Sequence, residues 1–125
     1  MVGDRLDTDI EGANAVGADS LLVLTGVSTV DDLLRASAEQ RPTYVAASLA
    51  SLDQPADLLR VAPHTSWDVR VDGGDLHLAA TQSAADPMEA LRGLLDIAWA
   101  NPGFGQVRPL DAHARSVVDA WAATV

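Results

Sequence analysis

Three carboxylates lie within six residues near the start of the chain, at Asp4, Asp7 and Asp9. They belong to the segment Gly3-Asp4-Arg5-Leu6-Asp7-Thr8-Asp9-Ile10, where a short apolar strand is expected to end and a helix to begin. Open α/β sheets bind their ligands at such strand ends. Crowded carboxylates repel one another unless a cation offsets their charge, and Mg²⁺ needs only one or two of them. The loop therefore indicates a magnesium site.

The same acids also have a structural interpretation, which the residue types leave open. Carboxylates are favoured near the positive end of a helix, where solvent is a sufficient partner. A calcium-binding EF-hand is another alternative, and its first positions would be Asp7, Asp9, Glu11 and Gly12. It is excluded because its twelfth position is Ala18, where a bidentate Glu is required.

Strands and helices alternate around this loop. Apolar runs predict parallel strands at 1–2, 21–24 and 44–46. The run Leu-Leu-Val-Leu at 21–24 is apolar throughout, which is typical of a strand covered on both faces. We therefore predict an α/β fold for residues 1–52, as a partial doubly wound (Rossmann-like) sheet.

Helix start signals lie between the predicted strands. Thr8, with Glu11 three residues later, is typical of a capping box. A second helix is predicted from a cap at Ser28 or Thr29 as far as Arg41-Pro42. These helices would hold the acidic loop at the end of the first strand.

The pattern changes after residue 52. Residues 53–65, a short helical turn with a proline on each side, are predicted to be a linker. Residues 66–125 are predicted to form a small ββαα appendage of unknown role. Its elements are signalled by Gly73-Gly74 for a β-hairpin and by Asp86-Pro87 and Asp111 for the starts of two helices.

The chain is acidic, with 18 Asp and Glu against 8 Lys and Arg and a net charge of −10. This balance disfavours nucleic acid and anionic membranes as partners, because both attract basic surfaces. The absence of cysteine excludes disulfides and thiolate metal sites. The sequence has no signal-peptide pattern and no apolar run near the roughly 18 residues of a membrane span. We expect a soluble, cytoplasmic protein.

Longer stretches of the sequence resemble a known family. The fourth motif of the haloacid-dehalogenase (HAD) phosphatases, with the segment after it, is similar to Val2-Gly3-Asp4-Arg5-Leu6-Asp7-Thr8-Asp9-Ile10, Gly12-Ala13, Gly17 and Leu22-Val23-Leu24-Thr25-Gly26-Val27. Pro42-Thr43-Tyr44-Val45 fits the family's last core strand. Within the superfamily, these 50 or so residues most resemble the C2-capped NagD or p-nitrophenylphosphatase group, which includes phosphoglycolate and glycerol-phosphate phosphatases.

The resemblance implies a role for each matched position. Asp4 would bind Mg²⁺ directly, and Asp9 would be a metal-site and catalytic residue that holds a metal-bound water or orients the site. Gly3 would let the backbone turn sharply beside the metal. Asp7 lies where the family varies and is expected to be structural, while Arg5 would point outward or brace the loop.

In the family's mechanism an aspartate attacks phosphorus, and water hydrolyses the resulting aspartyl-phosphate. That nucleophile belongs to an Asp-x-Asp motif after an apolar strand, which this chain lacks, as it lacks any Lys. The resemblance thus implies a C-terminal fragment of a Mg²⁺-dependent phosphomonoesterase, with nucleophile and cap expected before residue 1. The substrate would be a small phosphorylated metabolite such as glycerol phosphate or phosphoglycolate, and this chain alone is expected to be inactive.

A non-catalytic role is the alternative, either as a regulatory or interaction module or as an inactive truncated product. Residues 66–125 resemble part of an acetyltransferase-like (GNAT) domain, but they contain no Gly-rich turn for the phosphates of acetyl-CoA. The strand at 21–24 is expected to expose an unpaired apolar edge, so association is predicted, with a homo-oligomer as one outcome.

The remaining candidates are given structural interpretations. His64, His77 and His113 share no metal-ligand spacing, and the last two are expected to be exposed. The tryptophans occur on three separate elements at apolar-face positions, and are expected to form the core of the appendage: Trp67, Trp99 and Trp121.

Overall fold

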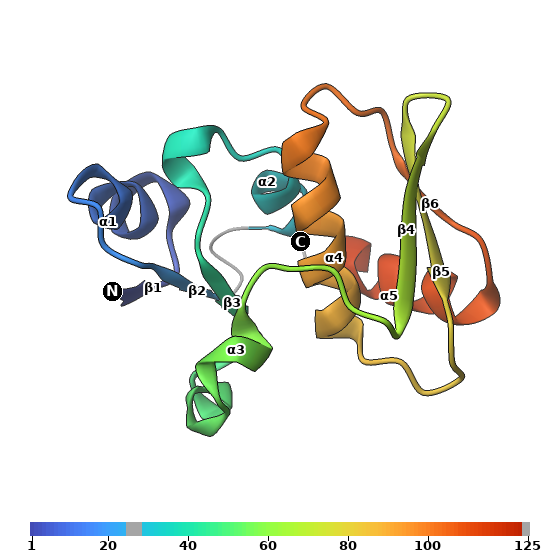
Figure 1. The fold of residues 1–125 in the computed structure, drawn as a ribbon, viewed down its shortest axis with the longest axis horizontal. Helices are drawn as coiled ribbons and strands as arrows, with labels where there is room; N and C mark the ends of the chain where they lie inside the picture. The colour runs from blue at the N-terminus through green and yellow to red at the C-terminus, as the bar shows by residue number, and fades with distance from the viewer. Residues whose placement is uncertain (25–28, 124–125) are drawn as a thin grey trace. The chain divides into compact units, whose positions relative to one another are not determined.

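The computed structural model describes residues 1–24 and 29–123. The chain divides into two units, Met1–Val61 and Ala62–Val125. Each unit contains a three-stranded sheet with its own helices (Figure 1). Within the described ranges, no helix combines the length and the apolar character that crossing a membrane requires.

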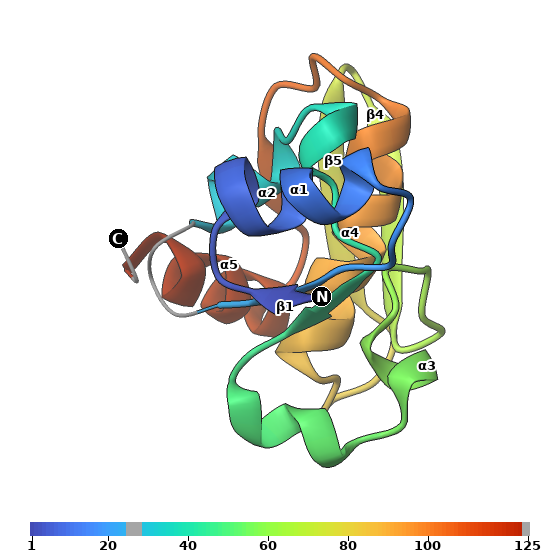
Figure 2. The same ribbon diagram turned by 90° about the vertical axis from the view of Figure 1, so that its left-hand side faces the viewer.

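The sheet of the first unit is parallel, with the order β1-β2-β3. Its strands match the predicted apolar runs: β1 (Val2–Gly3), β2 (Leu21–Val23) and β3 (Tyr44–Ala46). Helices cover both faces, with α1 (Glu11–Ala15) and α2 (Val30–Leu34) on one side and α3 (Ala56–Leu59) on the other (Figure 2). The predicted α/β fold class is confirmed.

The apolar run of β2 supplies both layers of this core. Leu21 and Val23 pack with Ala46 and with Leu59 of α3, and Tyr44 lies against this group. Leu22 points to the opposite face, because neighbouring side chains of a strand alternate, and it is fully buried. This explains why β2 has no polar position.

The prediction of an unpaired edge at residues 21–24 is wrong. β2 is the central strand, because two residues of β1 are enough to pair with it. The outer edge of β3 is also occupied, since Arg60 forms a bridge with Tyr44 and the amide of Val61 donates to the carbonyl of Thr43 at 3.1 Å. The exposed apolar side chains of this sheet are those of Met1 and Val2 on β1.

The second helix is shorter than predicted. α2 begins at a capping box between Thr29 and Asp32, whereas Ser28 lies outside the described residues. It ends at Leu34, and a separate 3₁₀ turn, η2 (Ala38–Gln40), follows. The Asn14 side chain donates to the carbonyls of Glu39 and Arg41, at 2.9 and 3.0 Å. These bonds hold the segment against α1.

The second unit contains a strand that the sequence patterns did not indicate. Its elements are β4 (Trp67–Asp72), β5 (Asp75–Ala80), α4 (Pro87–Ala100), β6 (Val107–Pro109) and α5 (Ala112–Ala123). The appendage is therefore ββαβα and not ββαα. β6 was missed because it is three residues long and ends in proline, so no alternation is visible. It pairs in parallel with β5.

The predicted hairpin and helix starts of the second unit are confirmed. Asp72 pairs with Asp75 across Gly73 and Gly74, whose φ angles of 62° and 84° are those of a two-residue turn that suits glycine. α4 begins at Pro87 and packs on β4 and β5, whereas α5 packs on β5 and β6. The core consists of small and aliphatic residues with two aromatic side chains, those of Trp67 and Phe104; the other members include Leu76, Leu78, Ala90, Leu91, Leu94, Leu95, Ala98, Ala114 and Val117.

The tryptophan prediction holds for one residue only. Trp67 is 5% exposed, and its indole N–H donates to the carbonyl of Asp86 at 2.9 Å. Trp99 and Trp121 are only half-buried, because the aliphatic residues of α4 and α5 fill the core. His113 is not exposed as predicted: its ring stacks on Trp67 with centroids 5.4 Å apart, and its Nε2 lies 2.8 Å from the carbonyl oxygen of Ala85.

Two carboxylates connect the C-terminal elements to β5. Asp111 accepts hydrogen bonds from the amide of Ala114, as the N-cap of α5, and from the amide of Ala80 on β5, at 2.7 and 2.8 Å. Asp75 accepts from the Arg108 side chain and from the amide of Gln106. These hydrogen bonds lower the pKa of Asp111 and of Asp75 below the ordinary value of 3.8, chiefly through Ala114 and through Arg108 respectively.

We predict that acid destabilises the second unit through these two groups. A carboxyl with a lowered pKa contributes stability above its ordinary pKa, and this is lost as the pH falls below about 4. Asp111→Asn keeps an oxygen acceptor but cannot titrate, so its melting temperature should fall less between pH 5 and 2.5 than that of the wild type. Asp111→Ala also loses the cap and should cost about 0.5–2 kcal/mol at pH 7.

The measurement is thermal unfolding of each variant followed by circular dichroism over that pH range. Asp119→Asn, an exposed change on α5, is the control. Parallel acid curves for Asp111→Asn and the wild type would show that Asp111 is not one of the groups responsible.

Candidate functional site

The acidic loop lies at the carboxyl end of β1, as predicted. Asp4 directly follows the strand, and a π-helical turn, η1 (Leu6–Ile10), begins two residues later. The amides of Asp9 and Ile10 both donate to the carbonyl of Arg5 at 3.2 Å, which widens the turn beyond an ordinary α-helix. Such turns are frequent at functional sites.

The side chain of Asp9 folds back onto the loop. Its Oδ2 accepts hydrogen bonds from the backbone amides of Asp4 and Arg5, at 3.2 and 3.3 Å. The capping box predicted for Thr8 and Glu11 does not form, because the helical segment already begins at Leu6. Asp9 therefore binds the loop amides and fixes the backbone that carries Asp4.

Gly3 is required by this contact. A Cβ atom at Gly3 would lie 2.3 Å from the Cβ of Asp9 and 2.5 Å from its Oδ2. Gly3 does not belong to the glycines with positive φ, so the sharp turn predicted for it is not the reason. The reason is the close approach of the Asp9 side chain.

Asp7 has a different partner. Arg5 donates to both oxygens of Asp7, from Nε at 3.3 Å and from Nη2 at 3.2 Å. Both side chains are more than half exposed, so the pair contributes little stability. It does direct the Asp7 carboxylate to Arg5, which agrees with the structural role expected for both residues.

The donor set of the loop suits a small hard cation. Asp4 and Asp9 are both half-buried, and the second oxygen of Asp9 accepts no hydrogen bond from the residues that the structure describes. Mg²⁺ is held by one or two carboxylates together with waters, which a pair of this kind can supply. Residues 1–24 and 29–123 contain no group of three or more His, Asp or Glu with metal-binding geometry. Thr25 and Gly26, which belong to the segment that resembles the HAD phosphatases, lie outside the described residues.

Asn14 is a positioning residue that the sequence patterns did not reveal. Its two bonds to the carbonyls of residues 39 and 41 hold α1, and with it the acidic loop, to the chain that leads into β3. No spacing rule connects these segments, because they are 25 or more residues apart. Only the tertiary structure brings them together.

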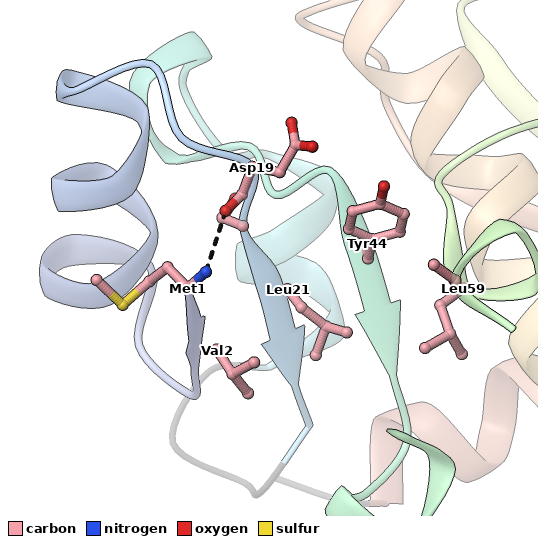
Figure 3. A pocket seen from close by; sticks show the side chains of 8 residues that line it. Met1, Val2, Asp19, Leu21, Tyr44 and Leu59 are labelled. Carbon is pink, nitrogen blue, oxygen red and sulfur yellow. Dashed lines mark hydrogen bonds between the residues drawn. The ribbon is translucent and has the colours of Figure 1, made fainter. Parts of the chain in front are cut away.

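An apolar hollow in the first unit lies away from this loop (Figure 3). It has a volume of about 230 Å³ and is lined mainly by Met1, Val2, Leu21, Tyr44 and Leu59. It opens beside the amino ends of β1 and β2, where the terminal amine donates to the Asp19 carbonyl at 3.3 Å. Asp4 follows the other end of β1, so the hollow is separate from the acidic loop.

Comparison with protein families identifies both units. Residues 1–52 match the HAD-hydrolase-like family, and residues 64–122 match the GCN5-related N-acetyltransferase like domain. Residues 1–52 belong to the HAD-like hydrolases. The family match includes the fourth-motif segment, all three strands of the first sheet and the acidic loop.

Individual phosphatases are similar in sequence to this chain. The D-glycerol 3-phosphate phosphatase of Mycobacterium tuberculosis is 40% identical over 97% of the chain, and the 4-nitrophenylphosphatase of Schizosaccharomyces pombe is 50% identical over 45% of it. The chain spans only 38% and 19% of the length of these two relatives. Phosphatases from two organisms are thus similar to all or part of this chain.

The fold agrees with these relatives. A crystal structure of glycerol phosphate phosphatase from Mycobacterium tuberculosis, in complex with magnesium, matches 97% of the chain with a TM-score of 0.89 and 40% identity. A calcium complex of the same protein gives a TM-score of 0.88. The chain covers 36% of each of these crystallised chains.

We predict that Gly3→Ala disrupts the acidic loop of this HAD-like unit. The added methyl group must displace Asp9, and overpacking of this kind typically costs about 1–3 kcal/mol. The amides of Asp4 and Arg5 should then exchange faster with solvent. Hydrogen exchange followed by NMR, together with thermal unfolding, measures both effects.

Gly12→Ala is the matched control, because Gly12 lies in α1 with open space around it. An alanine in a helix is neutral or stabilising by up to about 1 kcal/mol. Equal melting temperatures and equal loop protection in the two variants would contradict the role assigned to Gly3.

Proposed function

We propose that residues 1–52 form the metal-binding end of a magnesium-dependent phosphomonoesterase. The observation that carries this proposal is the loop at the end of β1, in which Asp9 binds the backbone amides that flank Asp4. The 40% identity to a glycerol 3-phosphate phosphatase and the fold shared with its magnesium complex support it. A small phosphorylated metabolite, with glycerol phosphate first, is the substrate that these relatives favour.

In this proposal Asp4 is the metal ligand and Asp9 the positioning residue. Bound Mg²⁺ supplies positive charge that stabilises the phosphoryl group during transfer. Asp9 holds the loop backbone through its Oδ2, and its other oxygen would be available to orient a metal-bound water. The nucleophilic aspartate, which forms and then releases the aspartyl-phosphate, belongs to polypeptide outside this sequence.

We also propose a division of the chain into a hydrolase part, a linker and an appendage. Residues 1–52 form the hydrolase part, residues 53–65 the linker and residues 66–125 the appendage. Within the proposed linker, Leu59 packs on the first sheet and Arg60 donates to the Tyr44 hydroxyl at 3.0 Å. The linker is therefore anchored to the hydrolase part at its centre.

For the second unit we propose a non-catalytic role. Phosphates bind at a helix N-terminus through free amides and the helix dipole. At the start of α4, Pro87 has no amide hydrogen, and Asp86 and Glu89 add negative charge. This terminus therefore opposes the phosphates of acetyl-CoA, although residues 64–122 match an acetyltransferase-like family.

The proposed non-catalytic role of the second unit is tested by thermal unfolding with and without acetyl-CoA. We expect no rise in melting temperature at 1 mM acetyl-CoA, because binding with a Kd well below that concentration would give a measurable rise. A saturable rise, lost in a variant that adds further charge at Met88, would overturn the non-catalytic assignment.

The phosphatase proposal is tested in a chimera. The 38% of the Mycobacterium tuberculosis phosphatase that this chain matches is replaced by this chain, and phosphate release from glycerol 3-phosphate is measured against Mg²⁺ concentration. We expect Mg²⁺-dependent turnover. Asp9→Asn should reduce metal affinity or activity by roughly 10- to 100-fold, and Asp4→Asn by more.

Asp7→Asn is the control, because Asp7 pairs with Arg5 at the surface and should change activity less than twofold. A folded chimera in which Asp4→Asn needs no more Mg²⁺ than Asp7→Asn would exclude Asp4 as the ligand. A folded chimera without any turnover would count against the phosphatase assignment itself.

A further inference from the structure

One nitrogen of His64 faces two groups that require opposite protonation states. The backbone amide of Ser66 donates to Nδ1 of His64 at 3.1 Å. The same Nδ1 lies 3.2 Å from Oε2 of Glu89, on the first turns of α4. An amide needs a lone pair on that nitrogen, whereas a carboxylate needs a proton on it.

The two contacts therefore belong to different states of the ring. In a neutral imidazole with its proton on Nε2, Nδ1 accepts the Ser66 amide and presents a lone pair to Glu89. In the imidazolium, Nδ1 donates to Glu89 and the Ser66 amide loses its acceptor. An imidazole ordinarily makes this change between about pH 5 and 8.

Ser66 connects this histidine to the interior of the second unit. Ser66 is 4% exposed, its hydroxyl accepts from the Gln82 side chain at 2.9 Å, and its carbonyl accepts from the amide of Thr81 at 2.9 Å. The His64 side chain itself is 41% exposed, so protons reach it directly. A change at His64 is thus passed to a buried backbone position.

Two further charged groups near this pair, Asp86 and Arg92, lie at or on α4. Glu89 also acts on the buried guanidinium of Arg92, as does Asp86. Burial lowers the pKa of Arg92, and the two carboxylates oppose that shift. Glu89 consequently has one permanent cationic neighbour in Arg92 and one that depends on pH in His64.

We propose that His64 is a pH-operated switch at the start of the second unit. When neutral, it caps the amide of Ser66. When protonated, it releases that amide and forms an ion pair with Glu89, which joins the 64–66 segment to α4. The switch is independent of the proposed phosphatase function.

The experiment follows the Ser66 amide by ¹⁵N NMR from pH 8 to pH 5 in the full chain. Exchange is expressed relative to an unstructured peptide at the same pH. We expect a shift of the Ser66 resonance and a roughly two- to tenfold loss of protection, the effect of losing one hydrogen bond. Glu89→Gln, which removes the ion pair, should move the transition to lower pH.

His64→Asn separates the two contacts. An Asn side chain accepts from an amide two residues later without titrating, so the Ser66 amide should stay protected and its resonance should not shift. His77→Asn, a histidine change on β5 where His77 pairs with Arg70, is the control and should behave as the wild type. A Ser66 resonance that does not move in the wild type, or that moves equally in His64→Asn, would overturn the proposal.

Discussion

The first unit depends on one carboxylate oxygen, Oδ2 of Asp9, which accepts the backbone amides of both Asp4 and Arg5. This contact requires a glycine at position 3 and is accompanied by a widened π-turn at Leu6–Ile10. It also fixes the direction in which the chain leaves β1. The backbone amides of a loop rich in negative charge thus provide partners for one of its own carboxylates.

The second unit uses the same interaction for a structural purpose. Asp111 and Asp75 accept backbone amides from segments more than 30 residues away, and these bonds hold α5 and β6 to β5. Charge-assisted bonds of this type are among the stronger hydrogen bonds in proteins. A chain with a net charge of −10 and no Lys thus has two ways to stabilise its carboxylates, through Arg side chains and through its own backbone.

The two units give different kinds of information about function. In the HAD-like unit, the acidic loop lies at the end of a parallel strand, within the residues that match the HAD-hydrolase-like family. The second unit matches an acetyltransferase-like family, while the start of its helix α4 carries a proline and two acids. A family match of this kind does not by itself give a function, because function depends on the groups at the site.

The sequence by itself determined the elements whose signals are local. The apolar runs located β1, β2 and β3, Gly73-Gly74 located the hairpin, and the Gly-Asp motif located the candidate site, because each depends on neighbouring residues only. Tertiary structure decided the features that depend on distant partners. β6 is a strand because it pairs with β5, and the ring of His113 is partly buried because it packs on Trp67. β2 is the central strand because both β1 and β3 pair with it. It also decided why residue 3 is glycine, since the need comes from a side chain six positions later that folds back over it.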